Sequence, residues 1–169
     1  MAFYQKEDKE FEEKVVQVRR VTKVVTGGKR MGFRVLAVVG DKKGKVGAGI
    51  GKASEVAVAI RKAVESAKKK MITFPQISGT IPHEVVGKLG ASSVLIRPAP
   101  SGRGVIAGGA VRVVLELAGV RDVVAKNIGS SNAINSAKAT LRALSSLRDL
   151  AKAQEIRGKQ LDVRYVQDV

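Results

Sequence analysis

The chain has no cysteine, a single histidine, and only two tyrosines and four phenylalanines among its 169 residues. The absence of cysteine excludes disulfide bonds, thiolate metal ligands and cysteine nucleophiles, and it fits a reducing cytoplasm. No apolar run reaches the roughly 18 residues that a membrane-spanning helix needs, and the acidic start of the chain is unlike a signal peptide. These absences predict a soluble cytoplasmic protein that has no contact with a membrane.

Side chains suited to catalysis are equally scarce. His83 lies between Pro82 and Glu84, and we expect it to be a surface or hairpin residue rather than a general base. No pair of ligands has a metal-binding spacing. The glycines of residues 47–52 lack the spacing of a phosphate-binding loop, and Lys52 occupies the third glycine position of the dinucleotide-binding pattern. We therefore predict no enzymatic activity, no cofactor, no metal and no small-molecule substrate.

Positive charge dominates the composition, with a formal net charge of +16. Residues 14–70 contain sixteen Lys or Arg against three acidic residues, a surplus of 13, whereas residues 1–13 sum to −3 and residues 71–169 to +6. A cationic field concentrated in one segment predicts a polyanionic partner.

The first half has the periodicity of a sheet. Valine-rich residues 14–25 predict a bent or bulged strand, which a basic glycine loop at residues 26–30 interrupts. Residues 33–39 alternate with period two, which predicts a strand with Phe33, Val35, Ala37 and Val39 on its core face. Residues 41–44 are typical of a hairpin turn.

The returning strand has one face without side chains, because glycines occupy positions 47, 49 and 51. Two interpretations stay open: a helix packs tightly on the glycines, or nucleic acid contacts the backbone there. Residues 54–70 predict such a helix. Its expected apolar stripe, with two alanines beside it, consists of Val56, Ile60, Val64, Ala67, Ala57 and Ala63.

The second half predicts a hairpin of residues 83–88 and 92–97, a proline-rich loop, a helix over residues 110–118 ended by Gly119, and a strand over residues 120–127. A further helix is expected after a cap at Ser130, Ser131 or Asn132. Its apolar stripe is expected to consist of Ile134, Ala137, Leu141, Leu144 and Leu147. Residues 149–169 predict a short helix and a tail.

The predicted fold class is α+β with two domains. The expected divisions are an N-terminal arm (residues 1–13), a first domain (14–73), a linker (74–82), a β-β-α-β-α second domain (83–150) and a C-terminal tail (151–169).

Few aromatic residues are available to stack on bases, so we expect RNA to be recognised by its backbone and shape. The predicted RNA-binding residues come from the basic loops and strand ends, where side chains and main chain can reach phosphates. They are Arg19, Arg20, Lys23, Thr26, Gly27, Gly28, Lys29, Arg30, Lys42, Lys43, Lys45 and Lys52. A second glycine cluster at residues 102–109 either offers helix amides to an anion or forms a flexible loop, and Arg103 and Arg112 lie nearby.

Residues 28–33, 39–49 and 51–53 closely resemble the fifth protein of the bacterial small ribosomal subunit, and the match continues through residues 82–83, 99–100, 102–109 and 126–130. The resemblance implies an N-terminal domain similar to double-stranded-RNA-binding domains but without their first helix, and a C-terminal split β-α-β domain. It implies a structural protein that contacts 16S ribosomal RNA where head meets body and messenger RNA enters, beside the fourth and eighth small-subunit proteins.

The resemblance also assigns roles to two regions. Residues 22–30 would reach the spectinomycin region of the RNA, and the stretch around Gly104 and Arg112 would face the fourth protein at an interface linked to decoding accuracy. Reversing the charges of Lys29 and Arg30 should then weaken RNA binding, whereas changing Arg103 or Arg112 should alter protein docking and fidelity. Two other functions stay open: a regulatory binder of double-stranded RNA acting off the ribosome, and an RNA-processing enzyme.

Overall fold

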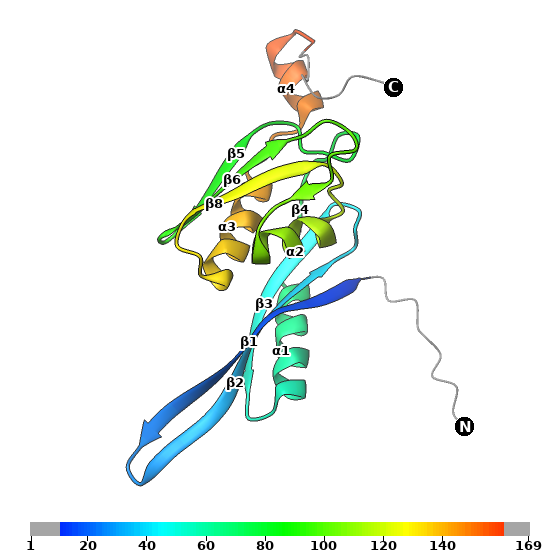
Figure 1. Cartoon of the computed structure of the whole chain (residues 1–169). Helices are drawn as coiled ribbons and strands as arrows, with labels where there is room; N and C mark the ends of the chain where they lie inside the picture. The colour runs from blue at the N-terminus through cyan, green and yellow to red at the C-terminus, as the bar shows by residue number, and fades with distance from the viewer. Residues whose placement is uncertain (1–10, 161–169) are drawn as a thin grey trace, which may run out of the picture.

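The computed structural model describes residues 11–160, whose strands form two four-stranded sheets in the orders β1-β2-β3-β4 and β5-β6-β8-β7 (Figure 1). The first sheet consists of β1 (Glu12–Val25), β2 (Gly28–Gly40), β3 (Lys45–Ala53) and β4 (Ile72–Thr73). The second consists of β5 (Val85–Leu89), β6 (Ser92–Pro98), β7 (Val105–Ile106) and β8 (Val123–Gly129). The helices are α1 (Val56–Lys68), α2 (Gly109–Ala118), α3 (Ala133–Ser145) and α4 (Leu150–Arg157). The predicted α+β class is confirmed.

The strands of the first sheet follow the sequence pattern closely. The irregular spacing in β1 corresponds to a bulge, because its register against β2 shifts between Val15 and Gln17. The turn between β2 and β3 is held by Asp41, whose Oδ1 accepts hydrogen bonds from the amides of Lys43 (2.7 Å) and Lys45 (2.9 Å). β1 begins at Glu12, two residues before the expected start; the rest of the predicted N-terminal arm, residues 1–10, lies outside the described residues, as do residues 161–169 of the predicted tail.

Helix α1 covers the glycine face of β3, so the first of the two interpretations of that face is confirmed. A Cβ atom built on Gly47, Gly49 or Gly51 would lie within 3.0 Å of the backbone of α1. Because the helix backbone lies so close to the sheet, mainly small side chains of α1 fit into the contact. The buried residues are Ala59, Ala63, Val64 and Ala67; of the predicted stripe, Val56 and Ile60 are only half-buried, and the neighbouring Ala57 is exposed.

The opposite face of the first sheet is also buried, which the alternation in β2 did not predict. Val35, Ala37 and Val39 pack under α1, while Leu36 and Val38 join a second, larger cluster. That cluster includes buried side chains of β6, α2, β8 and α3, so the second domain supplies the cover. Because each buried aliphatic side chain contributes roughly 1.5–3 kcal/mol, this shared core ties the two sheets into one unit.

The joint between the domains is made of backbone hydrogen bonds as well. The last carbonyls of α2, at Leu117 and Ala118, accept from the amides of Lys42 and Gly44 in the β2–β3 turn, each over 3.1 Å. Gly119 ends the helix in the left-handed conformation (φ 85°), as the sequence predicts. Carbonyls that a helix leaves without partners are thus capped by the other domain, which fixes how the domains are oriented.

In the second domain, α2 and α3 pack on one face of the sheet, and Asn132 caps α3 by accepting from the amide of Ile134 (3.1 Å). The predicted hairpin, central helix and following strand are all present. Strand β7 was not predicted, because two residues carry no periodicity; its pairing with β8 is the parallel step of the β-α-β unit. The expected stripe of α3 is buried only in part, because Ile134 and Leu141 are half-buried.

Candidate RNA-binding surface

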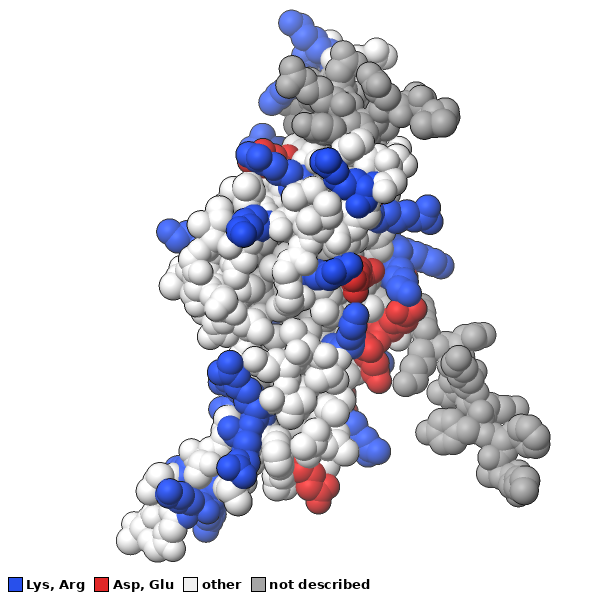
Figure 2. All heavy atoms as spheres, viewed as in Figure 1, with Lys and Arg blue, Asp and Glu red and all other residues white. Residues whose placement is uncertain are grey.

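The β1–β2 hairpin projects from the body, at the end of the molecule opposite α4 (Figure 1). Strand β3 pairs with β2 only as far as Phe33, so residues beyond it toward the turn at Thr26 and Gly27 form a two-stranded ribbon. A ribbon of this kind is open to solvent on both faces, and the one here has no aspartate or glutamate between residues 14 and 40. Figure 2 shows lysine and arginine side chains along it and no acidic ones on the face in view.

The cross-strand register places five cations on one face of the sheet. Three like-charged pairs lie directly opposite one another, and they are Arg19 with Arg34, Lys23 with Arg30, and Arg34 with Lys52. Opposed like charges destabilise a sheet. An anion between the strands would stabilise a row of three such pairs. We refer to the five side chains as the cation face.

Arg34 is the residue of this face that sequence reasoning missed. Arg34 alternates with the core residues Phe33 and Val35, so the sequence pattern predicts that it lies on a strand but does not by itself predict that it binds RNA. The available signal was that Arg34 lies four residues from Arg30 in the same strand, because residues two or four apart in a strand share a face.

The other predicted ribbon residues lie on the opposite face. The register pairs Arg20 with Phe33, and Val24 with Lys29, so these two cations are separated from the cation face by the thickness of the sheet. Val24 and Met31 are 73% and 63% exposed there. The turn is formed by Thr26 and Gly27, and the left-handed φ of Gly27 (96°) and the φ of Gly28 (148°) suit glycine.

Lys42, Lys43 and Lys45 are not brought together with the ribbon. They follow the far end of β2, about 30 Å from Arg30 at the usual strand rise. The Lys42 Nζ lies 2.6 Å from a carboxylate oxygen of Glu12, and its amide belongs to the domain joint. The predicted RNA-binding residues therefore form two separate basic regions, and the glycine face of β3 belongs to neither, because α1 covers it.

The second glycine cluster lies at the start of the β7–α2 segment. Arg103 is exposed, and the amide of Gly104 (φ 74°) donates to Oδ1 of the buried Asp122 over 2.7 Å. Helix α2 begins after Gly108 without a side-chain cap. Arg112 is exposed one turn into the helix, and its Nε donates to Oε1 of Glu116 over 2.9 Å.

Glu116 of α2 connects the two domains, and the sequence did not predict this role. Its other carboxylate oxygen accepts from Lys14 Nζ of β1 over 3.2 Å, so one carboxylate holds a cation from each domain. Partial burial would raise the pKa of Glu116, but the hydrogen bonds and positive charges of Arg112 and Lys14 outweigh it, and the pKa is lowered. The spacing of four residues from Arg112 on one helix was the local signal for this residue, whereas its link to Lys14, 102 positions away in the chain, has no local signal.

We expect Glu116→Gln to lower the free energy of unfolding at neutral pH by about 0.5 kcal/mol, since the pair is partly exposed. A carboxylate with a lowered folded-state pKa stabilises the fold above its unfolded pKa and loses that contribution as the pH falls through the folded value. The difference between Glu116→Gln and the parent chain, measured by urea unfolding, should therefore vanish on acidification below about pH 4. A difference that grows with acidification would contradict the assignment.

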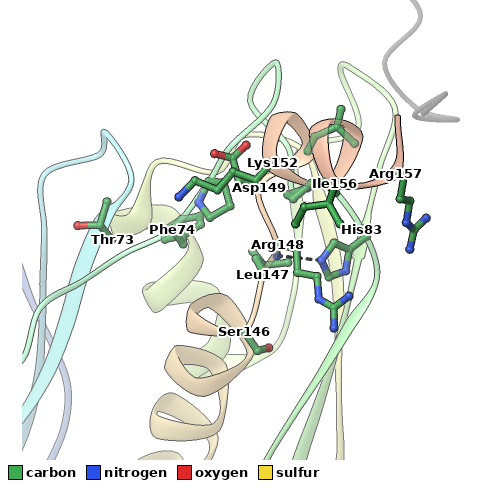
Figure 3. A pocket seen from close by; sticks show the side chains of 14 residues that line it. Thr73, Phe74, His83, Ser146, Leu147, Arg148, Asp149, Lys152, Ile156 and Arg157 are labelled. Atoms are coloured by element: carbon green, nitrogen blue, oxygen red, sulfur yellow. Dashed lines mark hydrogen bonds between the residues drawn. The ribbon is translucent and has the colours of Figure 1, made fainter. Parts of the chain in front are cut away.

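The single histidine is a structural link (Figure 3). His83 Nε2 accepts from the amide of Arg148 (3.1 Å), and its Nδ1 is 2.8 Å from the carbonyl oxygen of Glu84, to which only a protonated nitrogen can donate. The Nε2 bond thus joins the segment before β5 to the residues just before α4, while the Nδ1 contact stays within the segment of His83. The hollow beside it, of about 1130 Å³, is lined by side chains such as Phe74 and Ile156.

Within residues 11–160, no group of three His, Asp or Glu side chains is arranged to hold a metal ion. In the same part of the chain, no helix combines the length and the apolar character that crossing a membrane requires.

A projecting cationic ribbon on two packed α+β domains defines an RNA-binding protein that has two domains. The chain belongs to the ribosomal protein S5 family: the family model of the S5 N-terminal domain matches residues 11–75, and that of the S5 C-terminal domain matches residues 87–157. The resemblance drawn from the sequence is confirmed, and the chain is an RNA-binding ribosomal protein of the cytoplasmic translation machinery.

Curated relatives support the same family over nearly the whole chain, and each is called small ribosomal subunit protein uS5. The protein of Thermotoga petrophila is 54% identical over 148 residues, which cover 88% of this chain and 83% of the relative. The protein of Treponema denticola is 55% identical over 154 residues, with 91% and 89% covered. The protein of Acaryochloris marina is 52% identical over 159 residues, with 94% and 90% covered.

Proposed function

We propose that this chain is a non-catalytic structural component of the small ribosomal subunit that clamps 16S ribosomal RNA at the junction of head and body. The observation that carries the proposal is the cation face, where like charges oppose one another across three strands. Phosphates placed between these side chains would turn a repulsive arrangement into charge-assisted hydrogen bonds. Membership of a ribosomal protein family supports ribosomal RNA as the polyanion.

In this proposal the two domains have different tasks. The ribbon grips RNA through the cation face, and Lys43 and Lys45 offer a second basic region at the far end of the sheet, next to the domain joint. The second domain faces the fourth and eighth small-subunit proteins, near the channel through which messenger RNA enters. Because the joint fixes the orientation of the domains, movement of a protein neighbour would be transmitted to the ribbon.

Salt dependence tests the RNA clamp. If the five side chains of the cation face contact phosphates, the slope of log K against log salt should be about −4, so affinity should fall roughly 250-fold between 50 and 200 mM salt. The measurement is filter binding of the full chain to small-subunit RNA. A flat response would overturn the clamp. Sedimentation of cell extracts should show the chain in equal amounts with small subunits, and its absence from them would favour a regulatory RNA binder.

The stretch around Arg103, Gly104 and Arg112, which we propose to affect decoding accuracy, gives a separate prediction. Changing Arg103 or Arg112 to alanine should leave RNA affinity within about twofold, because neither residue lies on the ribbon and each is one charge among many. The same changes should weaken docking of the fourth small-subunit protein and alter the error frequency of translation, read with a misreading reporter. Loss of RNA affinity without any change in error frequency would remove the assignment of these residues.

A further inference from the structure

The second sheet has a face that no element of residues 11–160 covers. Helices α2 and α3 pack on the other face, where Val94, Ile96 and Ala125 are buried. Side chains alternate along each strand, so their neighbours point outward. The register pairs Val86 with Leu95, and Leu95 with Lys126. These three outward-pointing side chains therefore form one row across β5, β6 and β8.

Aliphatic side chains form a stripe along this outward face. Val86 and Leu95 are directly paired, and Val124 lies opposite Ile106 in the neighbouring row. Val86, Ile106 and Ile128 are 56%, 51% and 54% exposed. Together with the half-buried Leu95 and Val124 they give this face five large aliphatic side chains, and an apolar patch rimmed by polar residues is typical of an interaction site.

Cations border the stripe. Lys88, Arg97 and Lys126 are exposed on the same outward face, and Arg97 is paired with Glu84, with Nε 2.9 Å from the carboxylate. The two lysines form no ion pair with any other residue of the described part of the chain. The border therefore has a net charge of +2, from three cations and one carboxylate.

We propose that this face binds a protein neighbour whose surface is apolar at its centre and has aspartate or glutamate at its edge. Branched aliphatic side chains gain by being removed from water but offer nothing to a phosphate, which argues against RNA as the occupant. Carboxylates opposite Lys88 and Lys126 would complement the charged border. The proposal rests on the proposed place of the chain in the small subunit, and it assigns the outward sheet a task distinct from that of the ribbon.

The absence of cysteine in the chain allows a direct test. Val86→Cys introduces a single thiol at an exposed valine of the outward sheet. Its control, Val21→Cys, introduces one on the cation face, where Val21 lies opposite Gly32 between Arg19 and Lys23. Each variant is labelled with benzophenone maleimide, assembled into small subunits and irradiated. We expect Val86→Cys to crosslink to a protein through a peptide that contains apolar residues and at least one carboxylate, and Val21→Cys to crosslink to RNA. In unlabelled protein, maleimide should react with the thiol of the Val86→Cys variant at least about tenfold more slowly after assembly.

Crosslinking of the Val86→Cys variant to RNA or to a second copy of this chain would overturn the proposal, as would a peptide without carboxylates or a thiol that reacts equally fast after assembly. Ile106→Cys provides a second position on the same stripe if Val86→Cys does not fold. Sedimentation separates this test from that of the proposed function, because a folded parent chain that never joins the subunit would refute the latter.

Discussion

Replacing both Lys23 and Arg30 with glutamate should lower the affinity of the chain for small-subunit RNA roughly 100-fold at 0.1 M salt, or about 2.7 kcal/mol. The two side chains are opposite one another on the cation face. Their replacement removes two phosphate contacts and adds two repulsive charges. The slope of log K against log salt should become less steep by about 1.5, because two contacts are lost. Filter binding over a salt series measures both quantities.

Two control pairs change the net charge by the same amount. Lys152 and Arg157 lie on α4 at the opposite end of the molecule, and their change to glutamate should lower affinity less than about threefold. Arg20 and Lys29 lie on the other face of the ribbon and should have an intermediate effect. If the α4 pair weakens binding as much as the Lys23 and Arg30 pair, only net charge matters and the cation face is not a site.

A single change separates binding from stability. Lys23→Glu places a carboxylate opposite Arg30 and converts a repulsive cross-strand pair into an attractive one. The free energy of unfolding should be unchanged or higher by a few tenths of a kcal/mol, while RNA affinity falls about tenfold. Urea unfolding and filter binding of the same preparation would show the two effects. A loss of affinity that accompanies unfolding would argue for a structural role of Lys23.

Gly49→Ala should destabilise the protein by roughly 3–5 kcal/mol, a large part of the 5–15 kcal/mol that holds a typical domain together. The added Cβ atom would lie within 3.0 Å of backbone atoms of Ala63, Ser66 and Ala67 in α1, so the helix must move as a whole. Such a shift opens the core under α1, where Val35, for example, is fully buried. The midpoint of urea unfolding, followed by circular dichroism, measures the loss.

Gly108→Ala is the matched control, since it makes the same substitution where an added Cβ meets nothing within 4 Å. Gly108 has an ordinary extended conformation (φ −90°, ψ 145°), so alanine fits without strain. Its effect should stay within about 1 kcal/mol, because the lower entropy of the unfolded chain and the weaker helix cap oppose one another. Equal destabilisation by the two changes would mean that the fit of α1 on the glycines is not what matters.

Local patterns in the sequence predicted the elements well where one residue or a short repeat determines the conformation. Asp41 to Gly44 form the expected turn, Gly119 ends α2, and Asn132 caps α3. Strand β7 has too few residues for a pattern and was missed. The expected division into an arm, two domains, a linker and a tail stays a prediction, and the burial of Phe74 and Ile81 shows that the expected linker packs in the core.

The candidate site was predicted in its chemistry but not in its grouping. The basic segment and its family were found from the sequence alone, yet the twelve expected residues divide between two faces of a ribbon and a distant turn. Which cations share a face depends on strand register, and register depends on pairing between separate segments. The link of Glu116 to Lys14 was missed for this reason, since the two residues are 102 positions apart, whereas Arg34 lies four residues from Arg30 in one strand and could have been found.

The sequence by itself determined the class of protein, the polyanionic partner and the identity of nearly every strand and helix, because charge, periodicity and caps are properties of short segments. Only the tertiary structure decided that α1 lies on the glycines of β3, that the second domain buries the other face of β2, and that the C-terminal carbonyls of α2 fix the joint. Each of these contacts joins segments that lie apart in the chain, and close packing between such segments follows from shape, which a linear pattern does not contain.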